Sequence, residues 1–247
     1  MLRNSDGPEG QSQSPIPEEV ARTGDVMSTF DAPWALAGGW AVDAWLGRVT
    51  RDHEDVDIAV FDQQPLFEHL AGPGRGRPAW QLIGHEQGEV TQGGADLWDG
   101  HPLALPAHIH GRPPELSGPL PERFDDSGTR VLFPEDGFWL DVPFGERSGQ
   151  DWVLNSSAPA SAVAEPRLTM PLAECIRQSG WGLPTVAPEV ILFYKATLYV
   201  GTKNHLRPHD EADFVALLPL LTEGQREWLR EAVSRVYEGE HPWVGQM

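Results

Sequence analysis

The sequence predicts an α+β fold in which a mixed β-sheet flanked by helices is followed by a C-terminal helical part. Up to about residue 185, short apolar segments typical of strands are interleaved with short helical segments. From residue 187 onwards the apolar residues recur at the three- and four-residue spacing of helices. A mixed region followed by helices alone is typical of an α+β unit with an added helical part.

Three parts are expected along the chain of 247 residues. Residues 1–15 are mostly Ser, Gln, Gly, Pro and Asn, which bury too little apolar surface to offset the entropy of ordering, so a disordered tail is expected. Residues 16–185 are expected to form the α/β domain and residues 186–247 the helical domain. This length suits one large domain or two modest ones.

The first expected elements alternate between helix and strand. A helix is expected over 17–30, weakened by Gly24, and a strand over the apolar residues 34–37. A short helix over 39–47 follows, because apolar residues lie at helical spacing and Gly47 is a plausible stop. The next expected elements are a polar loop over 49–54, a strand over 55–61, a helix over 63–71, a turn over 72–78 and a strand over 79–84.

The middle of the chain is harder to interpret than either end. Residues 93–137 are rich in Pro, Gly, Trp and His, and only short strands are expected there. Two strands, over 138–144 and 151–154, are expected to be joined by a turn over 145–150 and followed by an exposed connection over 155–166. Helices are expected over 187–200, 209–221 and 222–239, and Thr222 with Gln225 three residues later has the pattern of a capping box.

The charge and the cysteine content exclude several classes of protein. The chain has 37 acidic and 18 basic side chains, a net charge of −19, which disfavours nucleic acid as a partner and suits a cationic small molecule. A single cysteine, Cys175, excludes a disulfide framework and is expected to be a small buried hydrophobe. Without an apolar run of about 18 residues or an apolar signal segment, we expect a cytoplasmic protein with no membrane partner.

Two aspartates and two glycines are the candidate residues for binding a metal ion and an anion. Asp55 and Asp57 are two residues apart on an expected strand, so both carboxylates point to one face. Two like charges beside a core are costly unless a cation lies between them, and oxygen ligands of this kind favour Mg²⁺. Gly38 and Gly39 follow a strand and open a helix, where free N–H groups attract an anion. Each pair alone is more often structural, but their order along the chain points to phosphoryl or nucleotidyl transfer.

The segment "GGWAVDAWLGRVTRDHEDVDIAV" at 38–60 resembles the signature of the DNA polymerase β-type nucleotidyltransferase superfamily. More narrowly, it looks like the aminoglycoside and lincosamide nucleotidyltransferases, and "GLPTVAPEVILFYKA", "RPHDEADF" and "HPW" add to the likeness. The resemblance implies a nucleotidyltransferase-type fold. It also implies transfer of AMP from ATP to a hydroxyl of a small acceptor, with release of pyrophosphate and with two Mg²⁺ ions as cofactors.

The same resemblance implies roles for individual residues. Asp55 and Asp57 would hold the metal, and Asp141 in "FWLDVPF" would be the third carboxylate, with Asp96 and Asp99 as rivals. Nucleotide contacts would come from Gly38, Gly39, Arg51 and Lys195. One of the loop residues Arg48, Arg51 and His53 would contact phosphate or pair with Glu54, unless the loop is simply solvated. Asp210 and Asp213 are interpreted as structural.

Some features favour other interpretations. The chain has His209 where relatives often have Lys, and "NSSAPAS" where they often have a basic run, so an alternative is a nucleotide-binding regulator or a protein-adenylylating homologue without small-molecule activity. His101, His108 and His110 make a zinc site conceivable, but no H-E-x-x-H motif accompanies them. The sequence identifies neither the acceptor nor the oligomeric state.

Overall fold

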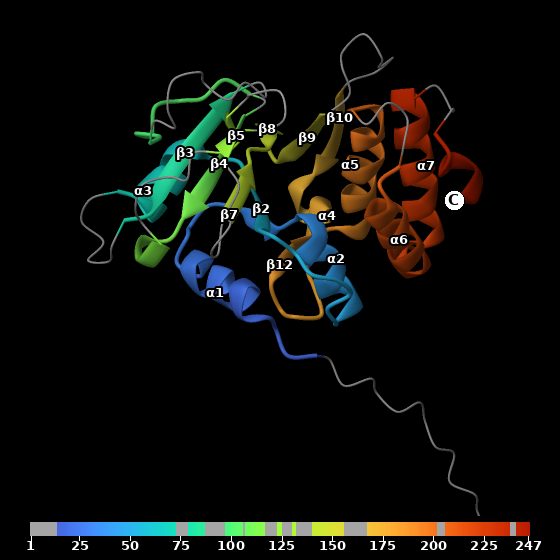
Figure 1. Cartoon of the computed structure of the whole chain (residues 1–247). Helices are drawn as coiled ribbons and strands as arrows, with labels where there is room; N and C mark the ends of the chain where they lie inside the picture. Colours follow the sequence, from blue (N-terminus) through green and yellow to red (C-terminus); the bar gives the residue numbers. More distant parts are fainter. Residues whose placement is uncertain are drawn as a thin grey trace, which may run out of the picture.

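The computed structural model describes residues 14–72, 79–86, 97–105, 107–116, 123–124, 130–131, 140–155, 167–201, 206–237 and 241–247. In Figure 1 a large sheet lies beside a group of C-terminal helices. The predicted tail 1–15, most of the middle region 93–137 and most of the connection 155–166 lie outside the described residues.

The main sheet has seven strands in the order β11-β12-β1-β2-β7-β4-β3. β1 is parallel to β12, β2 is parallel to β7, and the other neighbouring pairs are antiparallel. The mixed sheet predicted from the sequence is therefore confirmed. The strand bounds are β1 Trp34–Leu36, β2 Val56–Val60, β3 Gln81–Glu86, β4 Ala107–Arg112, β7 Leu140–Pro143, β11 Ile176–Gln178 and β12 Pro184–Val186.

Two smaller sheets accompany it. One has the order β10-β9-β8, with β8 Glu146–Ser148, β9 Asp151–Asn155 and β10 Arg167–Pro171, and the other pairs β5 Arg123–Phe124 with β6 Arg130–Val131. The turn predicted over 145–150 was too long, because β8 lies within it and pairs with β9 in a hairpin. The turn itself is Gly149 and Gln150, and Gly149 has a φ of 65°, which suits a residue without Cβ.

The helices follow the predicted pattern with shifted ends. Their bounds are α1 Glu18–Met27, α2 Gly38–Leu46, α3 Gln63–Leu70, α4 Leu172–Cys175, α5 Pro188–Gly201, α6 Pro208–Leu217 and α7 Glu223–Tyr237, with 3-10 turns at Pro114–Leu116, Leu218–Leu220 and Val244–Gln246. The helix predicted over 209–221 therefore ends at Leu217 and continues as a 3-10 turn. The capping box of α7 is confirmed, since Thr222 N donates to Gln225 Oε1 at 2.8 Å and Gln225 N donates to Thr222 Oγ1 at 3.4 Å.

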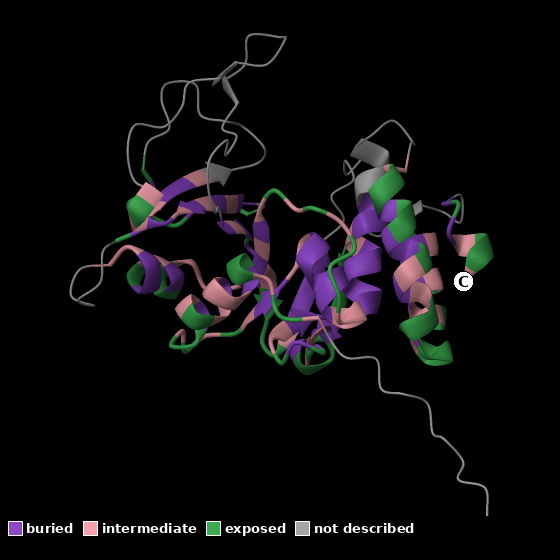
Figure 2. Ribbon diagram, turned by 60° about the horizontal axis from the view of Figure 1, so that its bottom comes forward, coloured by how far each residue is buried: buried purple, intermediate pink, exposed green. Residues whose placement is uncertain are grey.

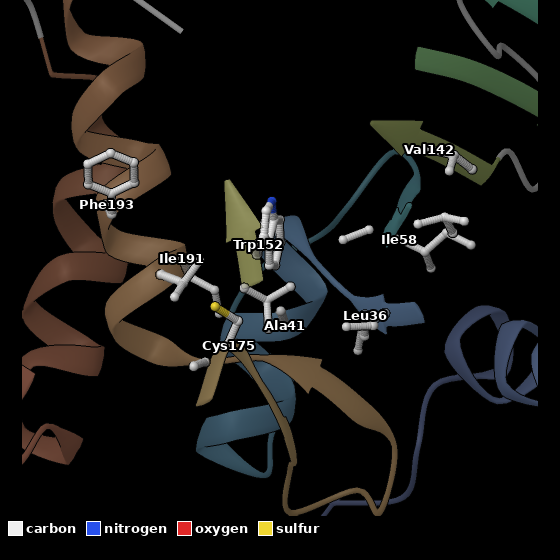
Figure 3. Packing of buried hydrophobic residues seen from close by; sticks show 14 of the residues in the cluster. Leu36, Ala41, Ile58, Val142, Trp152, Cys175, Ile191 and Phe193 are labelled. Atoms are coloured by element: carbon white, nitrogen blue, oxygen red, sulfur yellow. The ribbon is translucent and has the colours of Figure 1, made fainter. Parts of the chain in front are cut away.

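One hydrophobic core joins the sheet to the C-terminal helices. Figure 3 shows Trp152, Cys175 and Ile191 close to Ala41 of α2, between α5 and the strands of the main sheet. The buried cluster extends from Val20 in α1 to Trp243 near the end of the chain. Cys175 is fully buried in it, as predicted. The division into domains at residue 185 stays a prediction. None of the helices in the described ranges has the length and apolar character to span a membrane.

The central strands of the main sheet have one fully buried face and one partly open face. Along β4, buried and half-buried residues alternate, and the same alternation runs through the start of β2 and of β7, as the banding in Figure 2 shows. Because side chains alternate along a strand, the half-buried residues of the three neighbouring strands share one face. These residues are Asp57 on β2, Asp141 on β7, and His108, His110 and Arg112 on β4.

Candidate functional site

Three carboxylates from two neighbouring parallel strands meet on the open face of the sheet. Asp57 and Asp141 are direct register partners on β2 and β7. Asp55 was predicted to lie on the strand, but β2 begins at Val56, so Asp55 immediately precedes it. One oxygen from each of Asp55, Asp57 and Asp141 lies within 4.8 Å of the others. The structure therefore brings the three predicted carboxylates together.

The rival carboxylates do not join this group within the described residues. Asp99 is 78% exposed, and its Oδ1 lies 2.6 Å from Nδ1 of His101, which is 62% exposed. Asp96 lies outside the described residues. Since Asp99 is occupied at the surface by His101, Asp141 is the third carboxylate that the geometry favours.

The three carboxylates have perturbed acidity. Burial, and then the charge of Asp55, raises the pKa of Asp57 to about 7. Burial, and then the charges of Asp57 and Asp55, raises the pKa of Asp141 to about 8. Burial and the neighbouring Glu54 also raise the pKa of Asp55. Like charges in a low-dielectric site resist ionisation, and a bound cation would reverse that preference.

The donor set fits a divalent cation. Oδ1 of Asp141 is buried and accepts no hydrogen bond from the described part of the chain. A buried carboxylate oxygen without a donor is costly unless another positive group satisfies it. Three carboxylates with oxygens within 4.8 Å of one another, together with an unsatisfied oxygen on Asp141, suit a Mg²⁺ or Mn²⁺ ion.

Gly38 and Gly39 lie directly against the site. Gly38 has a φ of 58°, and a Cβ at this position would overlap the carboxylate of Asp57. A Cβ on Gly39 would lie 2.5 Å from Nδ1 of His53 and would also overlap the guanidinium of Arg51. Ala37, the residue before α2, donates its N–H to the carbonyl of Asp57 at 2.8 Å and provides no side-chain cap. The glycines thus allow the N-terminus of α2 to approach the carboxylates closely.

A buried aspartate in α2 holds the loop between α2 and β2. Asp43 is fully buried, accepts a hydrogen bond from Thr50 Oγ1 and has His53 Nε2 2.8 Å from its Oδ2. The His53 ring also packs on Trp40, with centroids 4.1 Å apart. In place of the predicted pairing with Glu54, the ring of His53 is anchored to Asp43, and its contact with phosphate stays a prediction. Sequence reasoning missed Asp43, although a lone acid within the apolar helix "GGWAVDAWL" was a signal.

Arg51 brings positive charge from the same loop. Its Nη1 donates to the carbonyl of Asp52 at 3.1 Å, and its Nε is buried without a hydrogen bond to the described residues. Its charge lowers the pKa of both Asp55 and Asp57, in opposition to their burial. Arg51 therefore lies beside the glycine turn and the carboxylates, and its contact with the nucleotide stays a prediction.

Lys195 lies on the other side of the site, in a buried network of ion pairs. Its Nζ is 2.8 Å from Oδ1 of Asp210 and 2.8 Å from Oδ2 of Asp213, which joins α5 to α6. Arg207 Nε pairs with the second oxygen of Asp210 at 2.5 Å. The charges of Lys195 and Arg207 both lower the pKa of Asp57. Lys195 is thus near the site but held by two aspartates, and Arg207 is a further cation that sequence reasoning missed.

Comparison with known proteins finds similarity in the part of the chain that holds Gly38, Gly39, Asp55 and Asp57. Residues 19–69 match the model of the family described as aminoglycoside-2''-adenylyltransferase, about a fifth of the chain. A 2''-aminoglycoside nucleotidyltransferase from Escherichia coli and one from Klebsiella pneumoniae are each 62% identical over 26 residues. That stretch is 10% of this chain and 15% of the length of these relatives. The match confirms the resemblance of 38–60 and ends before Asp141 and Lys195.

Several solved structures are similar over most of the chain at low identity. Lincosamide antibiotic adenylyltransferase LnuA, lincomycin-bound, is 13% identical with a TM-score of 0.46, covering 83% of this chain and 98% of its own. ANT(2'')-Ia in complex with adenylyl-2''-tobramycin is 18% identical with a TM-score of 0.42, covering 85% and 91%. A nucleotidyltransferase-like protein from Paracoccidioides brasiliensis is 16% identical with a TM-score of 0.43, covering 92% and 88%. The matched segment and the carboxylate geometry, rather than these distant likenesses, indicate the class of the site.

Proposed function

We propose that the protein is a Mg²⁺-dependent nucleotidyltransferase that transfers AMP from ATP to a hydroxyl of an aminoglycoside-like or lincosamide-like small molecule. The observation that carries the proposal is the meeting of Asp55, Asp57 and Asp141 beside the Gly38 turn. Five of the seven predicted site residues lie in the segment that matches the adenylyltransferase family, namely Gly38, Gly39, Arg51, Asp55 and Asp57. A cytoplasmic location is part of the same proposal.

Each part of the site has a role in this reaction. Asp55, Asp57 and Asp141 would hold Mg²⁺, which when bound neutralises the carboxylates and the charge of the phosphates. The N–H groups at the start of α2, with Arg51 and Lys195, would hold the triphosphate in line for attack. The carboxylate of Asp141 would also accept the proton of the acceptor hydroxyl.

The bonds balance without any further reactant. The acceptor oxygen forms a bond to the α-phosphorus of ATP, and the bond from that phosphorus to the bridging oxygen of the β-phosphate breaks. Pyrophosphate leaves with the electron pair, and the hydroxyl proton passes to the carboxylate of Asp141. The net charge of −19 suits a cationic acceptor, because an acidic surface raises its local concentration.

The first experiment measures pyrophosphate release from ATP and Mg²⁺ across a panel of aminoglycosides and lincosamides. We expect release that depends on one acceptor class and is lost in Asp57→Asn. Asp52→Asn is the matched control, since it makes the same charge change at an exposed position of the same loop. Acceptor-dependent release that persists in Asp57→Asn would refute the assignment of the carboxylates.

Two observations favour a second candidate function. Lys195 is held by Asp210 and Asp213, and only about a fifth of the chain matches the family. Both facts suit a protein that binds a nucleotide, or adenylylates a partner protein, without acting on small molecules. Tight ATP binding with no pyrophosphate release by any small acceptor would favour this alternative.

A further inference from the structure

Two histidines extend the polar row of the carboxylates across the sheet. β4 lies next to β7, and His110 is the direct register partner of Asp141. Asp57, Asp141 and His110 therefore occupy one row across the three adjacent strands β2, β7 and β4, which Figure 1 shows side by side. His108 lies two residues earlier on β4 and so shares the face of His110.

The side chains of this row are close enough to share one ion. His110 Nε2 is 3.6 Å from Asp141 Oδ1, too far for a hydrogen bond and close enough for common coordination. The rings of His108 and His110 have centroids 5.0 Å apart. One ligand atom from each of His108, His110 and Asp141 lies within 4.8 Å of the others. Asp141 thus belongs to two groups of possible ligands, one made of oxygens and one containing two nitrogens.

The chemistry of the second group differs from that of the carboxylates. A neutral imidazole nitrogen donates a lone pair to a metal ion. Two imidazole nitrogens and one carboxylate oxygen favour Zn²⁺ and its first-row neighbours, whereas Mg²⁺ prefers oxygen ligands alone. The buried and unsatisfied Oδ1 of Asp141 is the oxygen that such an ion would neutralise.

We propose that His108, His110 and Asp141 form a second metal site, selective for a divalent transition-metal ion such as Zn²⁺, with Asp141 shared between it and the Asp55–Asp57 pair. Three protein ligands leave positions open for water or for a group of the acceptor. The site goes beyond the proposed function, because its occupation requires neither nucleotide nor acceptor. The proposal predicts two adjacent metal sites with different preferences, Mg²⁺ at the carboxylates and a transition-metal ion at the histidines.

The test uses Co²⁺ as a coloured substitute for Zn²⁺, added to the full-length protein without nucleotide. We expect visible absorption bands of four- or five-coordinate Co²⁺ at about one equivalent, which Zn²⁺ removes and millimolar Mg²⁺ leaves in place. His108→Gln and His110→Gln should each weaken Co²⁺ binding by at least about tenfold, in the range found for lost metal-site groups. Asp55→Asn should retain the bands, because it alters only the oxygen site.

The controls separate this site from the other histidines and from unfolding. His101→Gln removes an exposed histidine that pairs with Asp99, and it should bind Co²⁺ as the parent protein does. Thermal melts show which variants remain folded, and Asp141→Asn provides a second route to the same loss. Equal binding by His110→Gln and the parent, or equal losses in Asp55→Asn and His110→Gln, would overturn the proposal. Because the readout is a spectrum, neither result depends on whether the protein transfers AMP.

Discussion

At the scale of single residues, Asp57 and Asp141 are placed for chemistry at a cost in stability. Burial raises the pKa of both carboxyl groups, to about 7 and about 8, from an ordinary value of 3.8. Between pH 4 and pH 8 the folded protein therefore holds protons that the unfolded chain has released. Stability falls with rising pH wherever the folded state binds more protons, so this contribution is present in full below pH 4 and is lost by about pH 8.

Asp57→Asn should therefore stabilise the protein when no metal is bound. The variant removes a carboxylate that is unfavourable in the folded state, and each kcal/mol gained raises the Tm by about 2–4 °C in a chain of this size. We expect a higher Tm than that of the parent at pH 8 and a smaller difference at pH 5, measured by thermal melts in EDTA. Mg²⁺ should raise the Tm of the parent more than that of the variant. A variant less stable than the parent at pH 8 would contradict this account.

Substitution of Gly38 tests whether activity requires the backbone of α2 to lie this close to the carboxylates. In Gly38→Ala the new Cβ overlaps Asp57, and the positive φ adds strain. We expect activity to fall at least about a hundredfold, since misplacement of reacting groups by about 1 Å has effects of this size. Gly149→Ala is the matched control: its φ is 65°, but nothing lies within 4 Å of a Cβ there. The control should lose some stability and keep its activity, and equal losses of activity in both would argue against the close approach.

At the scale of elements, the loop between α2 and β2 depends on one buried acid. Asp43→Asn keeps the shape of the side chain but removes the charge of the carboxylate that is hydrogen-bonded to Thr50 and His53. A buried hydrogen bond to a charged group contributes about 1.5–3 kcal/mol, so we expect a loss of this order in the free energy of unfolding by urea. The displaced loop also carries Arg51, so the KM for ATP should rise. Asp52→Asn, exposed in the same loop, should change neither quantity.

The ion-pair network between α5 and α6 decides what Lys195 does. Lys195→Ala leaves Asp210 and Asp213 buried without this cation, whereas Asp213→Asn breaks one of the two ion pairs and keeps the charge of Lys195. If Lys195 contacts the triphosphate, the KM for ATP should rise at least about tenfold in Lys195→Ala and change little in Asp213→Asn. Equal changes in the two variants would show that Lys195 acts only by holding α5 to α6.

Local sequence patterns predicted those helices and strands whose periodicity or caps lie within their own residues. The long helices α5 and α7 and the strands β2 and β9 have clear periodicity or caps. By contrast, β12 is a three-residue strand, Pro184–Val186, whose position is set by parallel pairing with β1, about 150 residues earlier in the chain. The partners of Asp141 on β4 likewise follow from strand order. The sequence therefore pointed to Asp55 and Asp57 by motif, whereas the juxtaposition of His110 with Asp141 required the topology.

At the scale of the whole molecule, the net charge of −19 makes opposite predictions for the two proposed substrates, ATP and a cationic acceptor. A negative field attracts a cationic aminoglycoside and repels ATP, and salt screens both effects. The screening length falls from about 10 Å at 0.1 M salt to about 3 Å at 1 M, so distant surface charges cease to act while contacts within the site persist. At saturating Mg²⁺ and ATP, the KM for the acceptor should rise several-fold between about 0.1 M and about 0.5 M NaCl, with kcat nearly constant.

The same titration at a saturating acceptor concentration gives the complementary result. The KM for ATP should stay level or fall with salt, because screening weakens the repulsion of the acidic surface. Potassium acetate in place of NaCl controls for specific chloride effects. A KM for the acceptor that does not respond to salt would mean that the acidic surface serves solubility alone. Recognition of the acceptor would then depend on short-range contacts at the open face of the sheet.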